Sequence, residues 1–128
     1  MKLKSNVRLL VTCDSGAATG KTTASKYLSR QFGLDLLTSG LLYRYVAYKL
    51  LISKKSATNN LFLKKITKNI NSKFLKNPKL YSPKVTNYTY EIAKIKKVRQ
   101  LLRKYQRKFA KKRLAILEGR DMGTLFPN

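Results

Sequence analysis

Hydrophobic and polar residues follow one another in blocks that predict strands and helices in turn along the chain. Apolar, partly β-branched runs predict three short buried strands at residues 7–13, 34–37 and 114–117. Apolar residues spaced three and four apart predict three helices at residues 21–32, 41–52 and 90–112. Gly33 ends the first helix, and Thr38 with Ser39 offers N-cap hydroxyls for the second. This alternation indicates an α/β fold, with a partial parallel sheet joined by crossover helices.

Residues 53–87 differ in character from the segments around them. They are rich in Lys, Asn and Ser, and they contain Pro78 and Pro83. A weaker helical period is carried by four apolar residues, Phe62, Ile66, Ile70 and Phe74. Such a composition is typical of an inserted, surface-facing segment. We therefore expect a single domain over residues 1–128 that contains this insert.

Composition narrows the classes of function. The chain has 128 residues, 43% of them apolar, which is enough for one modest core. A single cysteine and no histidine exclude a disulfide framework, Cys/His zinc sites and histidine acid–base chemistry. No apolar run approaches the roughly 18–20 residues of a membrane span. The N-terminal apolar stretch is short and no small-residue cleavage site follows it, so we expect a mature start and a cytoplasmic protein without a membrane partner.

The charge balance is strongly basic. There are 29 Lys and Arg residues against 5 Asp and Glu, a formal net charge of +24. A balance of this kind raises nucleic acid as a possible partner. However, 21 of the 29 cations are lysines spread from Lys2 to Lys112, in a chain also rich in Asn, Ile, Leu and Tyr, as an AT-rich coding sequence produces. A lysine-coated surface set by composition and a nucleic-acid footprint stay open as alternatives.

The loop between the first strand and the first helix carries a phosphate-binding pattern. Residues 15–22 fit the Walker A pattern, G-x-x-x-x-G-K-[ST], at its last three positions, Gly20-Lys21-Thr22. They depart from it at the first position, where Ser15 replaces the glycine. Loops of this kind wrap backbone N–H groups around a phosphate, at which the next helix directs its positive end. Lys21 would meet the β- and γ-phosphates, and the Thr22 hydroxyl would ligate Mg²⁺. A chance Gly/Ala-rich turn is the alternative, and the predicted strand before and helix after favour the phosphate loop.

Four ordered motifs resemble those of bacterial cytidylate kinases. The run from Leu9 to Thr23 resembles their phosphate loop. Thr38-Ser39-Gly40-Leu41-Leu42-Tyr43-Arg44 resembles their Asp-Ser/Thr-Gly-x-x-Tyr-Arg motif. The family's I-A, V-R and Q-R pairs have counterparts in Ile92-Ala93, Val98-Arg99 and Gln106-Arg107. Glu118-Gly119-Arg120-Asp121-Met122-Gly123-Thr124 matches the E-G-R-D-x-G-T signature, the most specific of the four. Another family of P-loop kinases is the alternative.

The resemblance implies a P-loop nucleoside monophosphate kinase that transfers the γ-phosphoryl group of ATP to CMP or dCMP, giving ADP and CDP or dCDP. The insert at 53–87 would help to bind the acceptor nucleotide. Donor phosphates would be bound by Ser15, Gly16, Ala17, Ala18, Thr19, Gly20, Lys21, Thr22 and Thr23, with Mg²⁺ at Thr22. The acceptor would be bound by Ser39, Arg44, Arg99, Arg120 and Asp121.

The resemblance also divides the roles among these residues. Arg44 and Arg120 would hold the phosphate of the acceptor, because a guanidinium fork fits two oxygens at once. Arg99 and Asp121 would read the cytosine edge. Lys21 and Arg120 would act catalytically by neutralising charge, a mechanism that needs neither a covalent intermediate nor a general base.

The sequence departs from the family pattern at several positions. Thr38 replaces the usual aspartate. In the phosphate loop, Ala18 replaces a glycine and Gly16 a proline. Tyr90 stands where the family has a small hydroxyl residue that contacts cytosine, and the neighbouring Thr89 is the candidate substitute.

The matched motifs correspond to the N-terminal part of the family's length. The family's C-terminal sheet half and arginine-bearing lid are missing from this sequence, so we expect an exposed strand edge. The chain would be a monomer or be completed by a second chain, and alone it would bind nucleotides with little turnover. Two other functions are alternatives: an inactive or split-gene kinase remnant, and a basic nucleic-acid-associated protein that uses the lysine-rich helix at 94–113.

Overall fold

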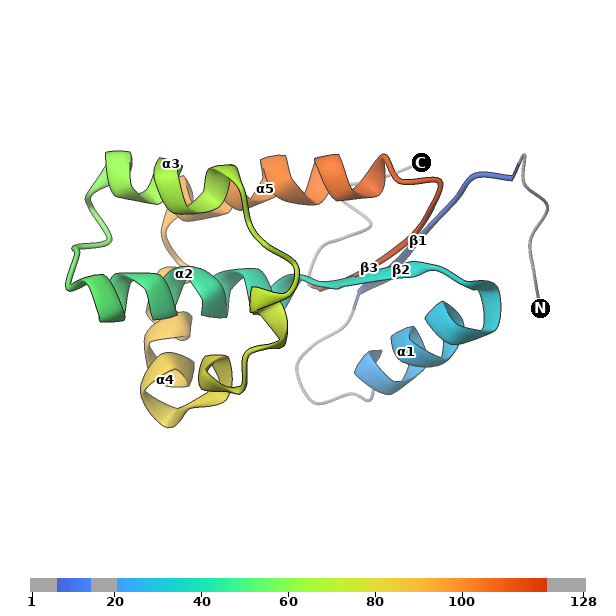
Figure 1. Cartoon of the computed structure of the whole chain (residues 1–128), viewed down its shortest axis with the longest axis horizontal. Coiled ribbons are helices and arrows are strands. Elements are labelled where there is room, and N and C mark those ends of the chain that lie inside the picture. Colours follow the sequence, from blue (N-terminus) through green and yellow to red (C-terminus); the bar gives the residue numbers. More distant parts are fainter. Residues whose placement is uncertain (1–6, 15–20, 120–128) are drawn as a thin grey trace. The chain divides into compact units, whose positions relative to one another are not determined.

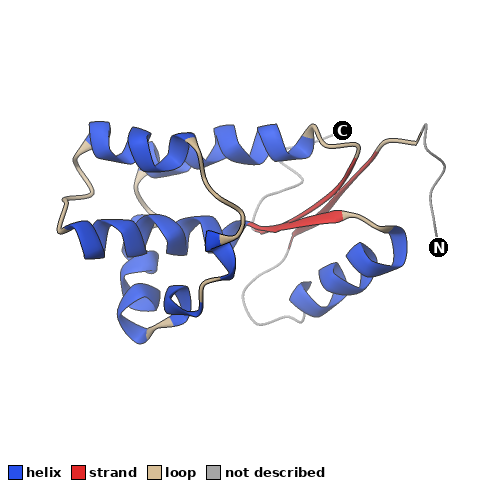
Figure 2. Cartoon of the chain, viewed as in Figure 1, coloured by secondary structure: helices blue, strands red, loops and turns tan. Residues whose placement is uncertain are grey.

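The computed structural model describes residues 7–14 and 21–119, without the side chains of residue 14 and residues 21–23. The chain divides into two compact units, one formed by Met1–Ser39 with Gln106–Asn128 and the other by Gly40–Tyr105. Within its described part, unit 1 contains a small β-sheet, whereas unit 2 is helical (Figures 1 and 2). The interpretation of a single domain with an insert at 53–87 stays a prediction.

Unit 1 is built on three parallel strands, β1 (Leu9–Asp14), β2 (Asp35–Thr38) and β3 (Leu114–Gly119). Their order is β1-β3-β2, so β3 is central and pairs with both neighbours. The positions of the three predicted strands are confirmed, and the parallel sheet with them. The sequence pattern ends the third strand two residues too early, because Glu118 is charged yet is buried in the ladder.

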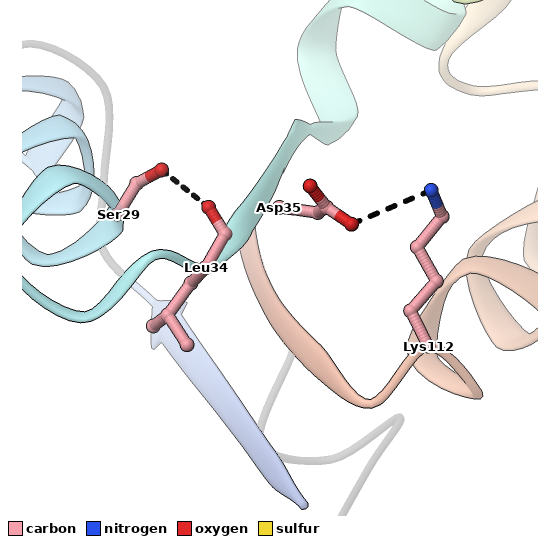
Figure 3. Close-up of polar contacts among 4 residues, drawn as sticks. All are labelled: Ser29, Leu34, Asp35 and Lys112. Carbon is pink, nitrogen blue, oxygen red and sulfur yellow. Dashed lines mark hydrogen bonds and ion pairs between the residues drawn. The ribbon is translucent and has the colours of Figure 1, made fainter. Parts of the chain in front are cut away.

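Helix α1 (Lys21–Phe32) joins β1 to β2 and packs against the sheet, as predicted (Figure 1). It ends at Gly33, whose φ of +65° lies in the left-handed region that glycine adopts readily. The Leu34 N–H donates to the Ser29 carbonyl at 2.9 Å, and the Ser29 hydroxyl donates back to the Leu34 carbonyl (Figure 3). The first bond uses the Ser29 carbonyl, one of those that the end of a helix leaves unpaired, so the turn at Gly33 leads directly into β2.

One ion pair of unit 1 joins Asp35 at the start of β2 to Lys112 just before β3 (Figure 3). The Lys112 Nζ lies 3.5 Å from the Asp35 Oδ2, and the two side chains are 51% and 64% exposed. A pair so exposed contributes only about 0–1 kcal/mol to stability. The sheet is therefore held mainly by burial of β3, where Ala115, Ile116 and Leu117 are inaccessible to solvent.

Unit 2 packs the greater part of two long helices, α2 (Ser39–Ser53) and α5 (Lys96–Ala110), with shorter elements between them. These shorter elements are α3 (Asn60–Lys68), η1 (Phe74–Lys76), η2 (Pro78–Tyr81) and α4 (Pro83–Ile92). The core of the unit consists of side chains that are almost fully buried, among them Leu42, Val46, Leu50, Leu63, Leu80, Ile92, Val98 and Leu102.

Two predictions for this region are wrong in part. The segment 53–87 is not simply surface-facing, because it supplies six buried apolar residues: Leu63, Ile66, Ile70, Leu75, Leu80 and Val85. The helix predicted over 90–112 is two helices, α4 and α5, separated by a turn after Ile92. Helix α4 begins earlier than expected because Pro83 occupies its first turn and the Ser82 hydroxyl accepts from the Val85 N–H at 3.3 Å.

Candidate functional site

The predicted site residues of unit 1 follow the carboxyl ends of the three strands. Strand β1 ends at Asp14, directly before the predicted phosphate loop, and β2 ends at Thr38, directly before Ser39. Strand β3 ends at Gly119, directly before Arg120 and Asp121. In the parallel register, residue 14 pairs with residue 119 and residue 38 with residue 118. The chain therefore leaves all three strands at one edge of the sheet, which is where α/β proteins bind ligands.

Several of the predicted residues lie outside the described part of the chain: Ser15–Gly20, Arg120 and Asp121. Lys21, Thr22 and Thr23 are described only as backbone, the first residues of α1. A helix that begins at Lys21 agrees with the Walker A pattern, since its first N–H groups carry the partial positive charge that a phosphate meets. The donor site itself stays a prediction.

Ser39 is buried at the beginning of α2, with 4% of its surface exposed. The Gln106 Nε2 donates to the Ser39 Oγ at 2.9 Å, and Gln106 is only 3% exposed. When a hydroxyl oxygen accepts a hydrogen bond from an amide, its own O–H can point in fewer directions. Gln106 therefore orients Ser39. Gln106 is noticeable in the sequence because it belongs to the Q-R pair. The pair alone does not reveal that Gln106 orients Ser39.

Arg44 is held by three neighbours within unit 2. Its Nη1 donates to the Leu80 carbonyl at 3.0 Å and to the Thr86 Oγ1 at 2.7 Å. Its guanidinium carbon lies 4.8 Å from the centre of the Tyr81 ring, a cation–π distance. Both hydrogen bonds come from Nη1, one of the three nitrogens that carry the five N–H donors of a guanidinium. Among the described residues, no hydrogen bond uses Nη2 or Nε, so this side of the planar guanidinium has donors for two oxygens of an anion such as a phosphate.

All three neighbours of Arg44 belong to the segment predicted as an acceptor-binding insert. Sequence reasoning selects Arg44 through its motif but misses Leu80, Tyr81 and Thr86. The hydrogen bond at Leu80 uses a backbone carbonyl, which carries no side-chain signal. Tyr81 and Thr86 lie among lysines and asparagines with no recognisable spacing. Only the packing of η2 and α4 reveals that they restrain the arginine.

Arg99 lies exposed on α5, and its guanidinium makes no hydrogen bond or ion pair within the described residues. It is near Tyr43 of α2. Burial raises the pKa of the Tyr43 hydroxyl, while the positive charges of Arg99 and Arg103 lower it part of the way back. The structure therefore brings Arg99 close to the residue that precedes Arg44 in the chain.

The suggested substitute for the family's small hydroxyl residue is engaged elsewhere. The Thr89 hydroxyl donates to the Val85 carbonyl of its own helix at 2.7 Å, so its proton is already used. Tyr90 is 68% exposed. Any contact of Thr89 with a cytosine would thus use the hydroxyl oxygen as an acceptor.

Two other kinds of site are absent from the part of the chain that the structure describes. Across residues 7–14 and 21–119, no three His, Cys, Asp or Glu side chains group as metal ligands. None of the described helices has the length and apolar character needed to cross a membrane.

Comparison with known proteins agrees with the four motifs. The profile of the family described as cytidylate kinase matches residues 11–128. The cytidylate kinase of Clostridioides difficile (strain 630) is 32% identical over 131 residues, which cover 94% of this chain and 61% of the relative. That of Acidiphilium cryptum (strain JF-5) is 34% identical over 120 residues, which cover 93% and 57%. The chain spans less than two thirds of the length of these curated relatives. Since the family profile extends over nearly all of it, the chain belongs to the cytidylate kinase family.

Proposed function

We propose that this chain takes part in the transfer of the γ-phosphoryl group of ATP to CMP or dCMP, giving ADP and CDP or dCDP. Membership of the cytidylate kinase family supports the reaction class. The observation that carries the proposal for the acceptor is the restrained guanidinium of Arg44. On this proposal the chain acts in the cytoplasm on small-molecule substrates, as a monomer or together with a second chain.

On this proposal, Arg44 binds the phosphate of the acceptor. Its contacts to Leu80 and Thr86 fix the plane of the guanidinium before the nucleotide arrives, so less conformational entropy is lost on binding. Arg120, which follows the central strand, supplies the second guanidinium. Ser39, oriented by Gln106, donates a hydrogen bond to the same ligand.

The donor side uses the chemistry of the phosphate loop. Backbone N–H groups of residues 15–20 and the first turn of α1 surround the phosphates of ATP, and Lys21 neutralises their charge. The Thr22 hydroxyl is a hard oxygen ligand at the beginning of a helix, and this is the donor type that Mg²⁺ accepts beside phosphates. Mg²⁺ bound there would neutralise charge on the β- and γ-phosphates. Lys21 and Arg120 stabilise the transferring group by position and charge.

Choice of base depends on Arg99 and Asp121. A carboxylate can accept from the amino group of cytosine, and a guanidinium can donate to its ring nitrogen and carbonyl. Uracil has a carbonyl in place of the amino group. The Asp121 carboxylate and this carbonyl are both hydrogen-bond acceptors, so they would form no hydrogen bond with each other. CMP is therefore preferred to UMP.

Isothermal titration of CMP and UMP against the full chain tests the acceptor site. Arg44→Gln should weaken CMP binding roughly 10- to 100-fold, because hydrogen bonds to a charged group contribute about 1.5–3 kcal/mol. Arg30→Gln removes the same charge from an exposed position on α1 and should leave CMP binding unchanged. A folded Arg44→Gln chain that binds CMP as well as the parent would contradict the proposal. A coupled assay of ATP consumption in the presence of CMP tests the transfer itself.

A further inference from the structure

The outward side of α5 carries a dense group of cations. Seven of the fifteen residues of this helix are Lys or Arg, about twice the share in the whole chain. Five of them lie within unit 2 and form what we call the basic face: Lys96, Lys97, Arg99, Arg103 and Lys104. All five are exposed except Lys97, which is half-buried. No Asp or Glu occurs between Glu91 and Glu118.

The basic face is separate from the side of α5 that builds the core. At 100° per residue, its five members occupy one half of the helix circumference. Val98, Leu101 and Leu102 point the opposite way, and each is at most 7% exposed. Burial of this apolar side holds the helix in unit 2, so the cations are presented to solvent on a fixed scaffold.

Helix stability does not account for this arrangement. Like charges three and four residues apart repel one another, as in Lys96 with Arg99 and Arg99 with Arg103. AT-rich coding explains lysine but not arginine, and two of the chain's eight arginines, Arg99 and Arg103, lie on this face. A surface with this charge, uncompensated on its own helix, is complementary to a polyanion.

We propose that the basic face of α5 binds the phosphate backbone of double-stranded nucleic acid without reading its sequence. The side chains of the face are Lys and Arg, which contact phosphates and carry no aromatic ring for stacking on unpaired bases. A lipid surface is the less suitable polyanion. A helix that binds a bilayer inserts its apolar side, and the apolar side of α5 is buried in unit 2.

This proposal predicts a steep dependence on salt. Each phosphate contact releases about 0.9 counterion from duplex DNA, so four or five contacts give a log–log slope of about −4. Binding should be nearly equal for duplexes of different sequence. Arg99 belongs both to the basic face and to the proposed acceptor site, so the test below leaves Arg44 and Arg99 unchanged.

Fluorescence anisotropy of a labelled 20-base-pair DNA duplex, titrated with the full chain at about 50–300 mM KCl, measures both affinity and slope. The test variant replaces Lys96, Arg103 and Lys104 with Gln. The control variant replaces Lys64, Lys65 and Lys68 of α3, which are equally exposed, with Gln. The two variants have the same net charge. Glutamine is a good helix former, and circular dichroism checks the fold of each.

We expect the α5 variant to bind the duplex at least 10-fold more weakly at about 100 mM KCl, with a slope smaller in magnitude by about 3. The α3 variant should change affinity less than about 3-fold. Equal losses in the two variants would overturn the proposal, since they would show attraction by net charge alone. So would tighter, α5-dependent binding to phosphatidylserine vesicles than to the duplex, or a strong preference between two duplexes of different sequence. If the triple α5 variant does not fold, the double variant Lys96→Gln with Lys104→Gln takes its place, with an expected slope change of about 2.

Discussion

Replacing Thr86 with Val removes one of the two hydrogen-bond acceptors that hold Arg44. The Thr86 Oγ1 accepts from the Arg44 Nη1 at 2.7 Å, and valine keeps the β-branched shape while it lacks the oxygen. The Leu80 carbonyl, at 3.0 Å from the same nitrogen, stays in place. We expect the variant to bind CMP more weakly, because the guanidinium is then held less firmly in the orientation that meets the phosphate.

The size of the effect follows from these contacts. A hydrogen bond to a charged group contributes about 1.5–3 kcal/mol, and an amount at or just below the bottom of that range applies to a half-buried guanidinium that retains another acceptor. A loss of about 1–1.5 kcal/mol corresponds to a dissociation constant roughly 5- to 10-fold higher. The loss should be smaller than for Arg44→Gln, which removes the charge itself.

Thr67→Val of α3 is a matched control in the same unit. The Thr67 hydroxyl donates at 2.7 Å to the Leu63 carbonyl of its own helix and makes no hydrogen bond to an arginine within the described residues. Both substitutions remove one hydroxyl from a helix of unit 2, and urea unfolding checks that each variant stays folded. Isothermal titration with CMP should separate them, with Thr67→Val like the parent. Equal affinity of the two variants would refute the reasoning that Thr86 acts through Arg44.

Three further predictions concern stability and ionisation. Gly33→Ala should lower the free energy of unfolding in urea by about 1–2 kcal/mol, because φ is +65° there. Gly40→Ala, in the first turn of α2, should raise it by no more than about 0.5 kcal/mol, since nothing lies within 4 Å of the added Cβ. Gln106→Met should lower it by about 1–3 kcal/mol, since the buried Ser39 Oγ loses its amide donor, and thermal unfolding measures this change. Burial raises the pKa of Tyr43 above its ordinary value of 10.0. Its contribution to stability is therefore complete below pH 10 and is lost as the pH rises through the folded-state pKa. Compared with the parent between pH 8 and 11, Tyr43→Phe should show a smaller loss of unfolding free energy.

The elements of unit 1 could be predicted from the sequence because each has a local cause. The apolar run of β3, the glycine that ends α1 and the loop pattern before Lys21 are properties of short segments. The strand order β1-β3-β2 is not such a property. It depends on which strands pair across more than 75 residues, and no short segment of the sequence contains that information.

Unit 2 was harder to predict because its local signals conflict. Pro83 suggests a loop when it is considered by itself, yet in the first turn of α4 it costs no hydrogen bond. The lysines and asparagines of residues 53–87 obscure apolar residues that are spaced irregularly and divided among α3, η1, η2 and α4. Such residues become a core only when several short elements pack together, and no window of one helical length contains that information.

The packing of this segment and the restraint on Arg44 have one physical origin. Leu80 is fully buried, and its carbonyl is one of the two acceptors that hold the arginine. Val85, also buried, adjoins Thr86, which provides the other acceptor. Burial of the two apolar side chains therefore fixes the two oxygens, so a change that loosens this part of the core also loosens the guanidinium. The segment thus needs its core in order to restrain Arg44, and this accounts for buried leucines and valine in a stretch whose composition is otherwise that of a loop.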